Sequence, residues 1–350
     1  MRARTAIAVS ALALAACGPP GLAVPSRAGV VPAPPAATAP SGETPPTAWE
    51  TPESLRRELA YLRQMAREHG DGFIFWLDSP HRTDTPQVFR TTAGRPFRAR
   101  AIVGNYEPAP MRAASLCLVD YAQRPWLAGS PATVHRAVLP ARTEASLDVA
   151  IAELPPGVHD VVFLTFFEPD GPAAAPGFSS GTRPPLSFHR ITVVVGEASA
   201  PRPAVTLARF GAPDRWAREG LWIYGLTRGE ADDVLDAPWR EEAAAPGAAV
   251  SYRVTLNNPS ATATTFALVA LLDYEQVPLA TEHRVFYGEL APWSRATVAG
   301  ALTAPAARGL HELLVLRVDN PFMDLSAPAS AAAPLSSILH GSERVRLTVR

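Results

Sequence analysis

From residue 73 onward, apolar residues occur in short runs with much alternation, bounded by Pro, Gly, Asn or Asp. A period of two is typical of β-strands with one buried face. In the first half the pattern predicts strands at Phe73–Leu77, Gln87–Thr92, Phe97–Val103, Ser115–Tyr121, Thr133–Leu139, Ala145–Ile151, Val158–Phe167 and Phe188–Val195. In the second half it predicts strands at Leu221–Gly225, Val250–Leu256, Phe266–Tyr274, Thr281–Tyr287, Arg295–Leu302, Leu310–Val318 and Glu343–Val349. This spacing predicts an all-β fold built from sandwiches.

The stretch before these strands, residues 51–70, has a helical period instead. Leu55, Leu59 and Leu62 recur at helical spacing, and Thr51 can serve as the N-cap. The sequence therefore predicts one short amphipathic helix. Its narrow apolar stripe favours docking on the following domain, although contact with lipid is an alternative.

One peptide occurs twice: LVDYAQRP begins at Leu118 and LLDYEQVP begins at Leu271. Other pairs follow in the same order: GFIFW with GLWIY, GRPFRARAIVGN with GAAVSYRVTLNN, HRAVL with HRVFY, GVHDVVFL with GLHELLVL, and RITVVV with RVRLTV. Their offsets stay between 148 and 154 residues, which chance does not easily produce. The chain is predicted to be a tandem duplication, with domains at 71–197 and 218–350 and a linker at 198–217.

The repeated peptides resemble those of bacterial immunoglobulin-like sandwiches of the fibronectin or CARDB type. The resemblance lies in a strand that ends in Asn (AIVGN, VTLNN), the proline-bearing loop after it, the apolar strand SLCLVDY or ALLDY, and the Gly-Val/Leu-His strand. It implies two tandem immunoglobulin-like domains. The cysteine pair and central tryptophan of antibody domains are absent from the pattern, so antibody-like specificity is not implied.

The N-terminus has the features of a signal peptide. Arg2 and Arg4 precede an apolar run that ends at Ala16 and is too short to span a bilayer. The sequence from Leu14 to Cys17 resembles the bacterial lipobox. This resemblance implies removal of residues 1–16, lipid attachment to Cys17 and membrane anchoring in the cell envelope, on the periplasmic or the outer surface. An ordinary secretory signal is the alternative.

Residues 17–50 form a Pro/Ala-rich tract that cannot bury an apolar core. We expect a disordered linker, which in polyproline geometry would reach roughly 100 Å at ~3.1 Å per residue. Such a linker would hold the folded domains away from the membrane.

Overall composition limits the possible functions. A formal net charge of −1 gives no reason to expect nucleic-acid binding. If Cys17 carries lipid, Cys117 is the single remaining cysteine of the two, and its apolar setting predicts a buried, inert thiol. No motif indicates a cofactor or a metal ion. The peptide GFSSG fits a nucleophile motif, but its flanks are loops, so no catalytic residue is assigned.

Polar residues recur at one predicted end of both domains. In an immunoglobulin-like topology, the end of one central strand lies near the starts of its two neighbours, which should gather Asp, Tyr and two His in each domain. The predicted polar cluster comprises Asp120, Tyr121, His135 and His159, with the counterparts Asp273, Tyr274, His283 and His311. A structural role at a sheet corner is favoured, and a divalent-metal or ligand site is the alternative.

Two long Pro/Ser/Ala-rich connections, 168–187 and 319–342, occupy equivalent places in the two domains. Loops of this length are usually functional or disordered. The apolar residues that could contact a partner are Phe178, Phe322, Met323, Leu325 and Ile338. Packing over the sheet edge is the alternative.

Taken together, the sequence predicts a membrane-anchored cell-envelope lipoprotein that works in binding, adhesion or scaffolding through tandem immunoglobulin-like domains. We expect a protein partner in the envelope. A non-catalytic accessory subunit of an envelope enzyme or secretion complex remains open, and a hydrolase is less favoured.

Overall fold

The computed structural model describes residues 73–83, 87–152, 154–169, 186–197, 203–228, 239–280, 283–323, 339–342 and 344–350, with scattered positions between 53 and 64. The predicted signal peptide, Cys17 and the linker 17–50 lie outside the described residues. So do Phe178, Leu325 and Ile338 of the predicted partner-contact loops. No helix in the described part of the chain is long and apolar enough to cross a membrane.

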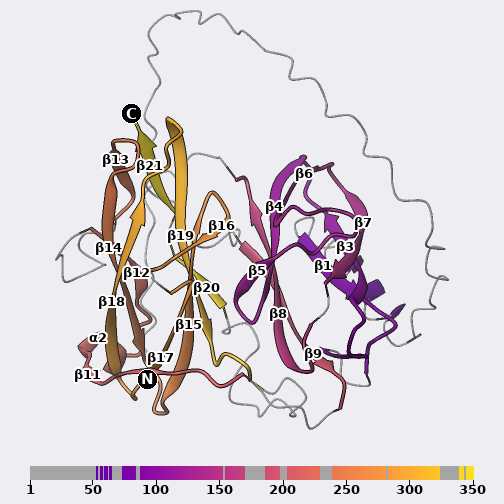
Figure 1. The fold of residues 1–350 in the computed structure, drawn as a ribbon, viewed down its shortest axis with the longest axis horizontal. Helices are drawn as coiled ribbons and strands as arrows, with labels where there is room; N and C mark the ends of the chain where they lie inside the picture. The colour runs from indigo at the N-terminus through magenta and orange to yellow at the C-terminus, as the bar shows by residue number, and fades with distance from the viewer. Residues whose placement is uncertain are drawn as a thin grey trace, which may run out of the picture. The chain divides into compact units, whose positions relative to one another are not determined.

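The first sandwich pairs two sheets, coloured indigo to magenta in Figure 1. One sheet has the order β1-β3-β7, and the other has the order β2-β9-β8-β4-β5, with β6 also paired to β4. The strands are β1 (Phe73–Asp78), β2 (Val88–Thr91), β3 (Phe97–Asn105), β4 (Met111–Val119), β5 (Ala122–Arg124), β6 (Val134–Leu139), β7 (Thr143–Ile151), β8 (Gly157–Phe167) and β9 (Leu186–Val195).

The second sandwich repeats this plan, in orange to yellow. Its sheets have the orders β11-β18-β14-β12 and β10-β17-β15-β19-β21-β13, with β16 paired to β15 and β20 to β19. The strands are β10 (Ala208–Phe210), β11 (Ala212–Pro213), β12 (Tyr224–Thr227), β13 (Glu241–Ala244), β14 (Ala249–Asn258), β15 (Thr264–Leu272), β16 (Glu275–Val277), β17 (Val285–Leu290), β18 (Ser294–Thr303), β19 (Gly309–Asp319), β20 (Leu339–Gly341) and β21 (Val345–Val349).

Both sandwiches are immunoglobulin-like, as the sequence predicted. In the first, β4 is antiparallel to both β6 and β8, and β2 runs parallel to β9 along the sheet edge. In the second, β15 is antiparallel to β17 and β19, and β13 runs parallel to β21. The equivalent strands follow the same order along the chain, which supports the predicted duplication.

At the repeated peptide, two predicted strands extend too far. Asp120 and Tyr121, placed in a strand by their apolar surroundings, instead form the turn between β4 and β5 and have φ angles of 49° and 67°. Asp273 and Tyr274 do the same between β15 and β16. The short strands after these turns are absent from the prediction because three residues are too few to show a period.

Part of the predicted linker 198–217 pairs with the second sandwich. Strand β10 lies parallel to β17, and β11 lies antiparallel to β18. The short helix α2 (Arg215–Arg218) follows, with Asp214 as its N-cap accepting a hydrogen bond from the N–H of Ala217. These elements cover edges of the second sandwich only.

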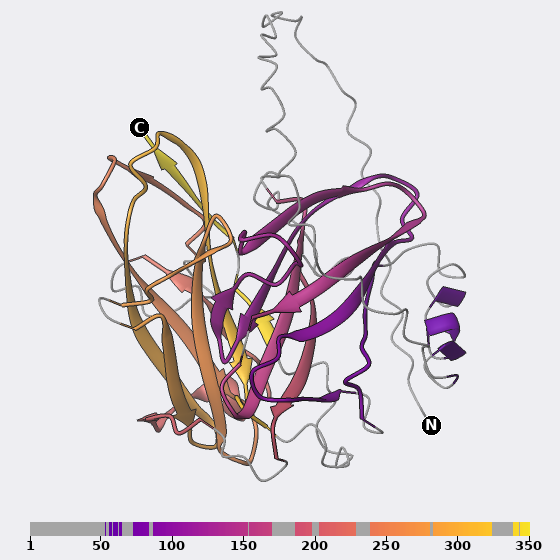
Figure 2. The ribbon, with the colours of Figure 1, turned by 45° about the vertical axis from the view of Figure 1, so that its right-hand side comes forward.

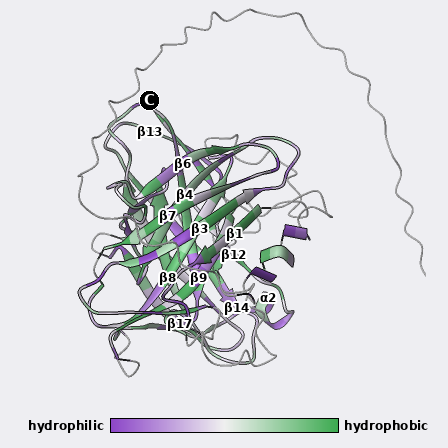
Figure 3. Cartoon of the chain, turned by 90° about the vertical axis from the view of Figure 1, so that its right-hand side faces the viewer, coloured by the Kyte–Doolittle hydropathy of each residue, from purple (hydrophilic) through white to green (hydrophobic). Residues whose placement is uncertain are grey.

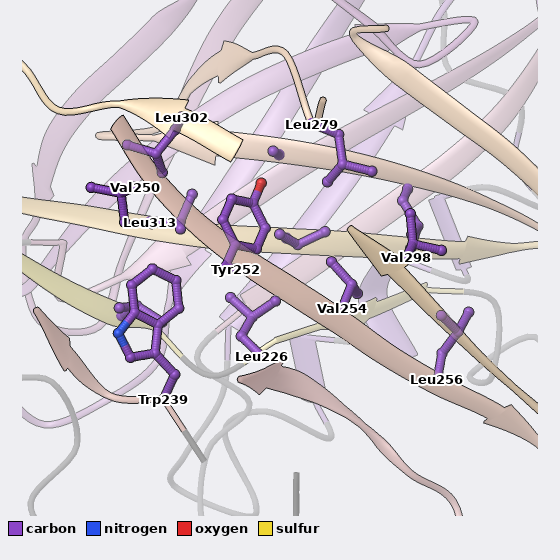
Figure 4. Close-up of a cluster of buried hydrophobic side chains, with 14 of the residues drawn as sticks. Leu226, Trp239, Val250, Tyr252, Val254, Leu256, Leu279, Val298, Leu302 and Leu313 are labelled. Atoms are coloured by element: carbon purple, nitrogen blue, oxygen red, sulfur yellow. The ribbon is translucent and has the colours of Figure 1, made fainter. Parts of the chain in front are cut away.

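Each sandwich has its own core. Figure 3 shows hydrophobic residues concentrated along the strands. In the second sandwich, Tyr252 lies among Leu226, Val254 and Leu313, with Trp239 stacked at a ring distance of 5.8 Å (Figure 4). In the first, Cys117 is fully buried, and desolvation raises the pKa of its thiol, as an inert core cysteine requires.

Helical residues between 53 and 64 lie beside the first sandwich (Figure 2). Leu59 is buried and packs against Ile74, Trp76 and Tyr106 on the outer face of the sheet that holds β1 and β3. Arg63 also donates from Nε to Glu144 at 2.7 Å. The predicted docking of this helix on the following domain is therefore present.

We predict that Gly300→Ala destabilises the second sandwich. Gly300 pairs with Tyr252 across β14 and β18, and an added Cβ would lie 2.4 Å from two atoms of the buried tyrosine ring. Overpacking of this kind costs about 1–3 kcal/mol, which chemical denaturation can measure. The control is Gly211→Ala, where the nearest atom is 3.9 Å away and a change within about 0.5 kcal/mol is expected. Equal unfolding midpoints for Gly300→Ala and the wild type would contradict the prediction.

Candidate functional site

The two sandwiches meet through the repeated peptide, at an interface built from equivalent residues of both. We call this the interdomain interface; its polar members are Asp120, Tyr121, Gln123, His159, Asp160 and Arg190 in the first sandwich and Asp273, Tyr274, Gln276, His311, Glu312 and Arg344 in the second. Strands β5 and β16 lie side by side here (Figure 1).

Each repeated peptide turns sharply between two strands. Val119 pairs with Ala122 across the first turn, so only Asp120 and Tyr121 connect β4 to β5. Both residues have positive φ, which is the geometry of the type I′ hairpin turn. This geometry normally favours Gly or Asn in the second position, so a tyrosine there needs support from other contacts.

The carboxylate of Asp120 supplies this support by fixing the turn to β8. The N–H of Asp120 donates to the carbonyl of Asp160 at 2.8 Å, and Asp120 Oδ1 accepts from the N–H of Asp160 at 3.0 Å. Asp120 Oδ2 lies 2.7 Å from His159 Nδ1. Asp273 makes the same three contacts with Glu312 and His311 in the second sandwich, at 2.8, 2.9 and 2.6 Å.

Both ring nitrogens of His159 face acceptors. Nδ1 faces the Asp120 carboxylate, and Nε2 lies 2.8 Å from the carbonyl oxygen of Pro155. A carbonyl can only accept, so both hydrogen bonds form fully only when the ring is a doubly protonated imidazolium. Burial lowers the pKa of His159, but the hydrogen bonds to Asp120 and Pro155 and the charge of Asp120 outweigh it and raise the pKa. The same causes raise the pKa of His311, whose Nε2 lies 3.0 Å from the carbonyl of Ala307.

Behind this turn lies a buried ion pair. Arg190 donates from Nε to Asp160 Oδ1 at 2.9 Å, and both side chains are nearly inaccessible to solvent. Tyr121 donates its hydroxyl to the same carboxylate. Burial and the charge of Asp160 raise the pKa of Tyr121, so its hydroxyl stays protonated and remains a donor.

Arg190 also reaches into the second sandwich. It donates to the carbonyls of Asp319 and Asn320 at 3.1 and 2.8 Å. Arg344 reaches the opposite way, donating to the carbonyls of Glu168 and Phe167 at 3.0 and 2.6 Å. Each sandwich thus places one arginine at the end of a central strand of the other. Arg190 lies at the end of β19, and Arg344 lies at the end of β8.

Two glutamines complete this reciprocal pattern. The N–H of Gln123 donates to Gln276 Oε1 at 2.7 Å, and Gln276 Nε2 donates to the carbonyl of Tyr121 at 2.9 Å. In return, Gln123 Nε2 donates to the carbonyl of Tyr274 at 2.9 Å. The interface therefore has an approximate twofold relation, as expected when two copies of one surface pair with each other.

Apolar side chains surround these polar contacts. Buried residues of β4, β8, β15 and β19 form one hydrophobic cluster shared by the two sandwiches. Tyr121 packs edge-on against Phe322 with ring centroids 5.4 Å apart, and Phe166 packs against Tyr274 at 4.9 Å. Apolar burial of this kind is the main favourable term in domain association.

Two histidines of the predicted polar cluster lie elsewhere. His135 pairs with Ser115, five residues before Asp120 on β4, which corresponds to roughly 16 Å of strand at ~3.3 Å per residue. Its ring contacts Trp126 instead. His283 makes backbone bonds with Leu279 and Ala280 and has no contact with Asp273 among the described residues. Asp120, Tyr121 and His159 do come together, as do their three counterparts.

His135 and His283 are both followed by Arg, but the two histidines do not occupy equivalent positions. Ser115 is equivalent to Leu268 through the repeated peptide, and Leu268 pairs with Phe286. His135 therefore corresponds to Phe286 in the second sandwich. Strand register, rather than identical letters, determines which residues are equivalent.

Phe322 and Met323, two predicted partner-contact residues, line the interdomain interface. Phe322 is buried, and its N–H donates to Asp160 Oδ2 at 3.0 Å. Met323 packs against the shared cluster. At these two positions the loop packs on the chain itself, which agrees with the alternative prediction.

Arg190, Asp160 and the two glutamines are absent from the polar cluster predicted from the sequence. A signal was present, because Gln123 and Gln276 recur in the repeated peptide and Arg190 and Arg344 open the last matched pair. In the structure these polar groups bind one another. Across the described ranges, no group of three or more His, Cys, Asp or Glu side chains could hold a metal ion.

No protein-family model and no curated protein matches this sequence. Similar solved structures include a CARDB domain from Pyrococcus furiosus in complex with di-metal ions, at 9% identity over 36% of this chain and 96% of that chain, with a TM-score of 0.24. A protein of unknown function from Porphyromonas gingivalis is 11% identical over 79% of this chain and 99% of that one, with a TM-score of 0.23. The native conformation of α2-macroglobulin from E. coli is 12% identical over 79% and 17%, with a TM-score of 0.24. Such low scores support no conclusion about ligand or activity.

We predict that Arg190→Met destabilises the chain by about 3–5 kcal/mol, because it leaves the buried carboxylate of Asp160 without its counter-charge. Chemical denaturation measures the loss. Arg346→Met is the matched control, since Arg346 pairs at 3.5 Å with the exposed Glu241 and should cost less than about 1 kcal/mol. Similar losses in the free energy of unfolding for the two variants would show that the buried pair matters no more than an exposed one.

We also predict that stability falls as pH rises above neutrality. The pKa of His159 and of His311 is raised in the folded chain, so their contribution is fully present below the unfolded pKa of about 6.5 and is lost as pH rises through the folded pKa. The measurement is the free energy of unfolding between about pH 7 and pH 9, above the range in which burial lowers the pKa of His81, His135 and His189 and gives the opposite dependence. The double variant Asp120→Asn, Asp273→Asn should show a weaker dependence. A wild-type profile that is flat or rises over this range would refute the prediction.

Proposed function

We propose that this chain is a membrane-anchored lipoprotein of the bacterial cell envelope, in which two immunoglobulin-like domains act as one binding, adhesion or scaffold module. The lipobox-like sequence from Leu14 to Cys17 supports the anchor. The Pro/Ala-rich tract after it suits a tether that presents the module on the periplasmic or the outer surface.

The observation that carries the module part of this proposal is the reciprocal interdomain interface. Tandem domains with a small polar contact are expected to move independently. Here Arg190 and Arg344 cross in opposite directions, and an apolar cluster surrounds them. A pair held at many points in this way can present one fixed surface to a partner.

The same observation bears on the alternatives. The Asp, Tyr and His side chains that could have done acid–base chemistry at the repeated turn are engaged with one another and with backbone groups. This favours binding over hydrolysis at that place. Nothing specific to the structure favours an accessory role in an enzyme or secretion complex over a free-standing scaffold.

We expect Cys17→Ser to release the chain from the membrane fraction. The wild-type chain should incorporate labelled fatty acid, sediment with membranes and cross-link to an envelope protein, whereas the variant should lack the label and the sedimentation. An unlabelled wild-type chain would contradict the anchor. A wild-type chain that is labelled but gives no cross-linked partner would contradict the binding role.

A further inference from the structure

One sheet edge differs between the two sandwiches. Strands β6 and β17 are equivalent, since Val138 pairs with Arg112 and Glu289 pairs with Thr265, which is the matching position of the repeat. The outer side of β17 carries β10, which runs parallel to it from Ala208 to Phe210. No strand in the described part of the chain pairs with the outer side of β6.

The segment that could have covered β6 has another role. The chain before the first sandwich is helical between residues 53 and 64 and packs through Leu59 on the outer face of the sheet with β1 and β3. The chain before the second sandwich instead supplies β10. The two copies therefore have equivalent edge strands, β6 and β17, but the chain before each sandwich takes a different structure.

The backbone of β6 is suited to accept a strand. The N–H of Ala291 donates to the carbonyl of Phe210 at 2.9 Å, so this end of β17 directs its hydrogen-bonding groups to β10. Backbone groups alternate in direction along a strand, so Glu289 also faces β10. Its counterpart Val138 then directs its N–H and C=O to the open side of β6. Val138 as a whole is 63% exposed.

We propose that β6 binds an extended segment of a partner protein as an added parallel strand, in the way that β17 binds β10. This inference rests on the proposed binding function and names the surface for it. Strand addition obtains affinity from main-chain hydrogen bonds and specificity from alternate side chains.

The side chains on this edge indicate the partner's chemistry. Arg209 of β10 lies 3.7 Å from Glu289, so the second sandwich selects a basic residue at the middle position. The first sandwich has Val138 there, which favours an apolar residue in the guest strand. Leu139 and Leu290 are both buried at the next position, so the aromatic residue provided by Phe210 suits both edges.

A proline limits the length of this contact. Pro140 occupies the position of Ala291 and has no N–H, so a guest strand lacks the bond that Phe210 accepts in the second sandwich. Proline at a sheet edge is a common protection against uncontrolled pairing. The expected interaction is therefore short and reversible.

The test uses the purified full chain and two synthetic peptides. One has this chain's own β10 sequence, VTLARFG, and the other replaces the arginine, VTLAVFG. We expect the second peptide to bind more tightly and to slow hydrogen exchange of the Val138 amide, which faces the open side of β6. N-methylation of the peptide's Phe should abolish binding, because parallel pairing directs that N–H at β6, and N-methylation of the preceding Val, which faces away, should not.

Two chain variants sharpen the result. Val138→Glu should reverse the preference in favour of VTLARFG by about threefold, the size of an exposed ion pair. Pro140→Ala should strengthen both peptides by about threefold or more, since it restores one hydrogen bond.

The inference is overturned if neither peptide slows exchange of the Val138 amide, if both N-methyl peptides bind alike, or if the Val138 amide is already protected in the chain alone. The last result would mean that the chain's own segment or a second copy covers β6. If an envelope partner cross-links equally to the wild type and to Val138→Glu, β6 is not the binding surface, but the proposed binding function still holds. Absence of any cross-linked partner would contradict the proposed binding function itself.

Discussion

The docking of the two sandwiches depends on the buried guanidinium of Arg190. It is bound to Asp160 in its own sandwich and to the carbonyls of Asp319 and Asn320 in the other. A buried ion pair adds little net stability compared with apolar side chains of similar size, but losing one partner is costly. Its effect is therefore to specify one docked geometry, while the surrounding apolar cluster supplies the driving force.

Much of the fold was predictable, because alternation and turn residues mark strands with one buried face. The interface was harder to predict, although SLCLV held a clue. A continuous apolar run is typical of a strand buried on both faces. On β4, Cys117 packs in the core of the first sandwich, whereas Leu116 and Leu118 pack against the second. A single sequence does not say which surface covers the second face.

The errors at the repeated peptide have a physical cause. The usual sequence marker of a type I′ turn is Asn-Gly or Asp-Gly, whereas here the second residue is Tyr121, a strand-former by propensity. The contacts that hold this residue in the left-handed region come from β8 and β9, which are distant in sequence. Long-range contacts override local propensity at this turn, and local patterns cannot report them.

The two repeats also show how a duplicated surface can change its role. The sheet faces that meet at the interface kept their chemistry, because a change on one side would leave its partner unsatisfied. The edges at β6 and β17 carry no such mutual constraint. There, Val138 stands where the other copy has Glu289, and Pro140 where it has Ala291.

The reciprocal interface has a consequence for biogenesis. Gln123 and Gln276 bond across 153 residues of sequence, so the first sandwich can complete its own core well before its docking partner exists. N-terminal domains generally fold first during synthesis, and exposed apolar surface at that stage promotes aggregation. Until the second half of the chain folds, Leu116, Leu118 and Leu164 remain uncovered. Folding of this protein would therefore include an interval in which a chaperone has a defined apolar face to protect.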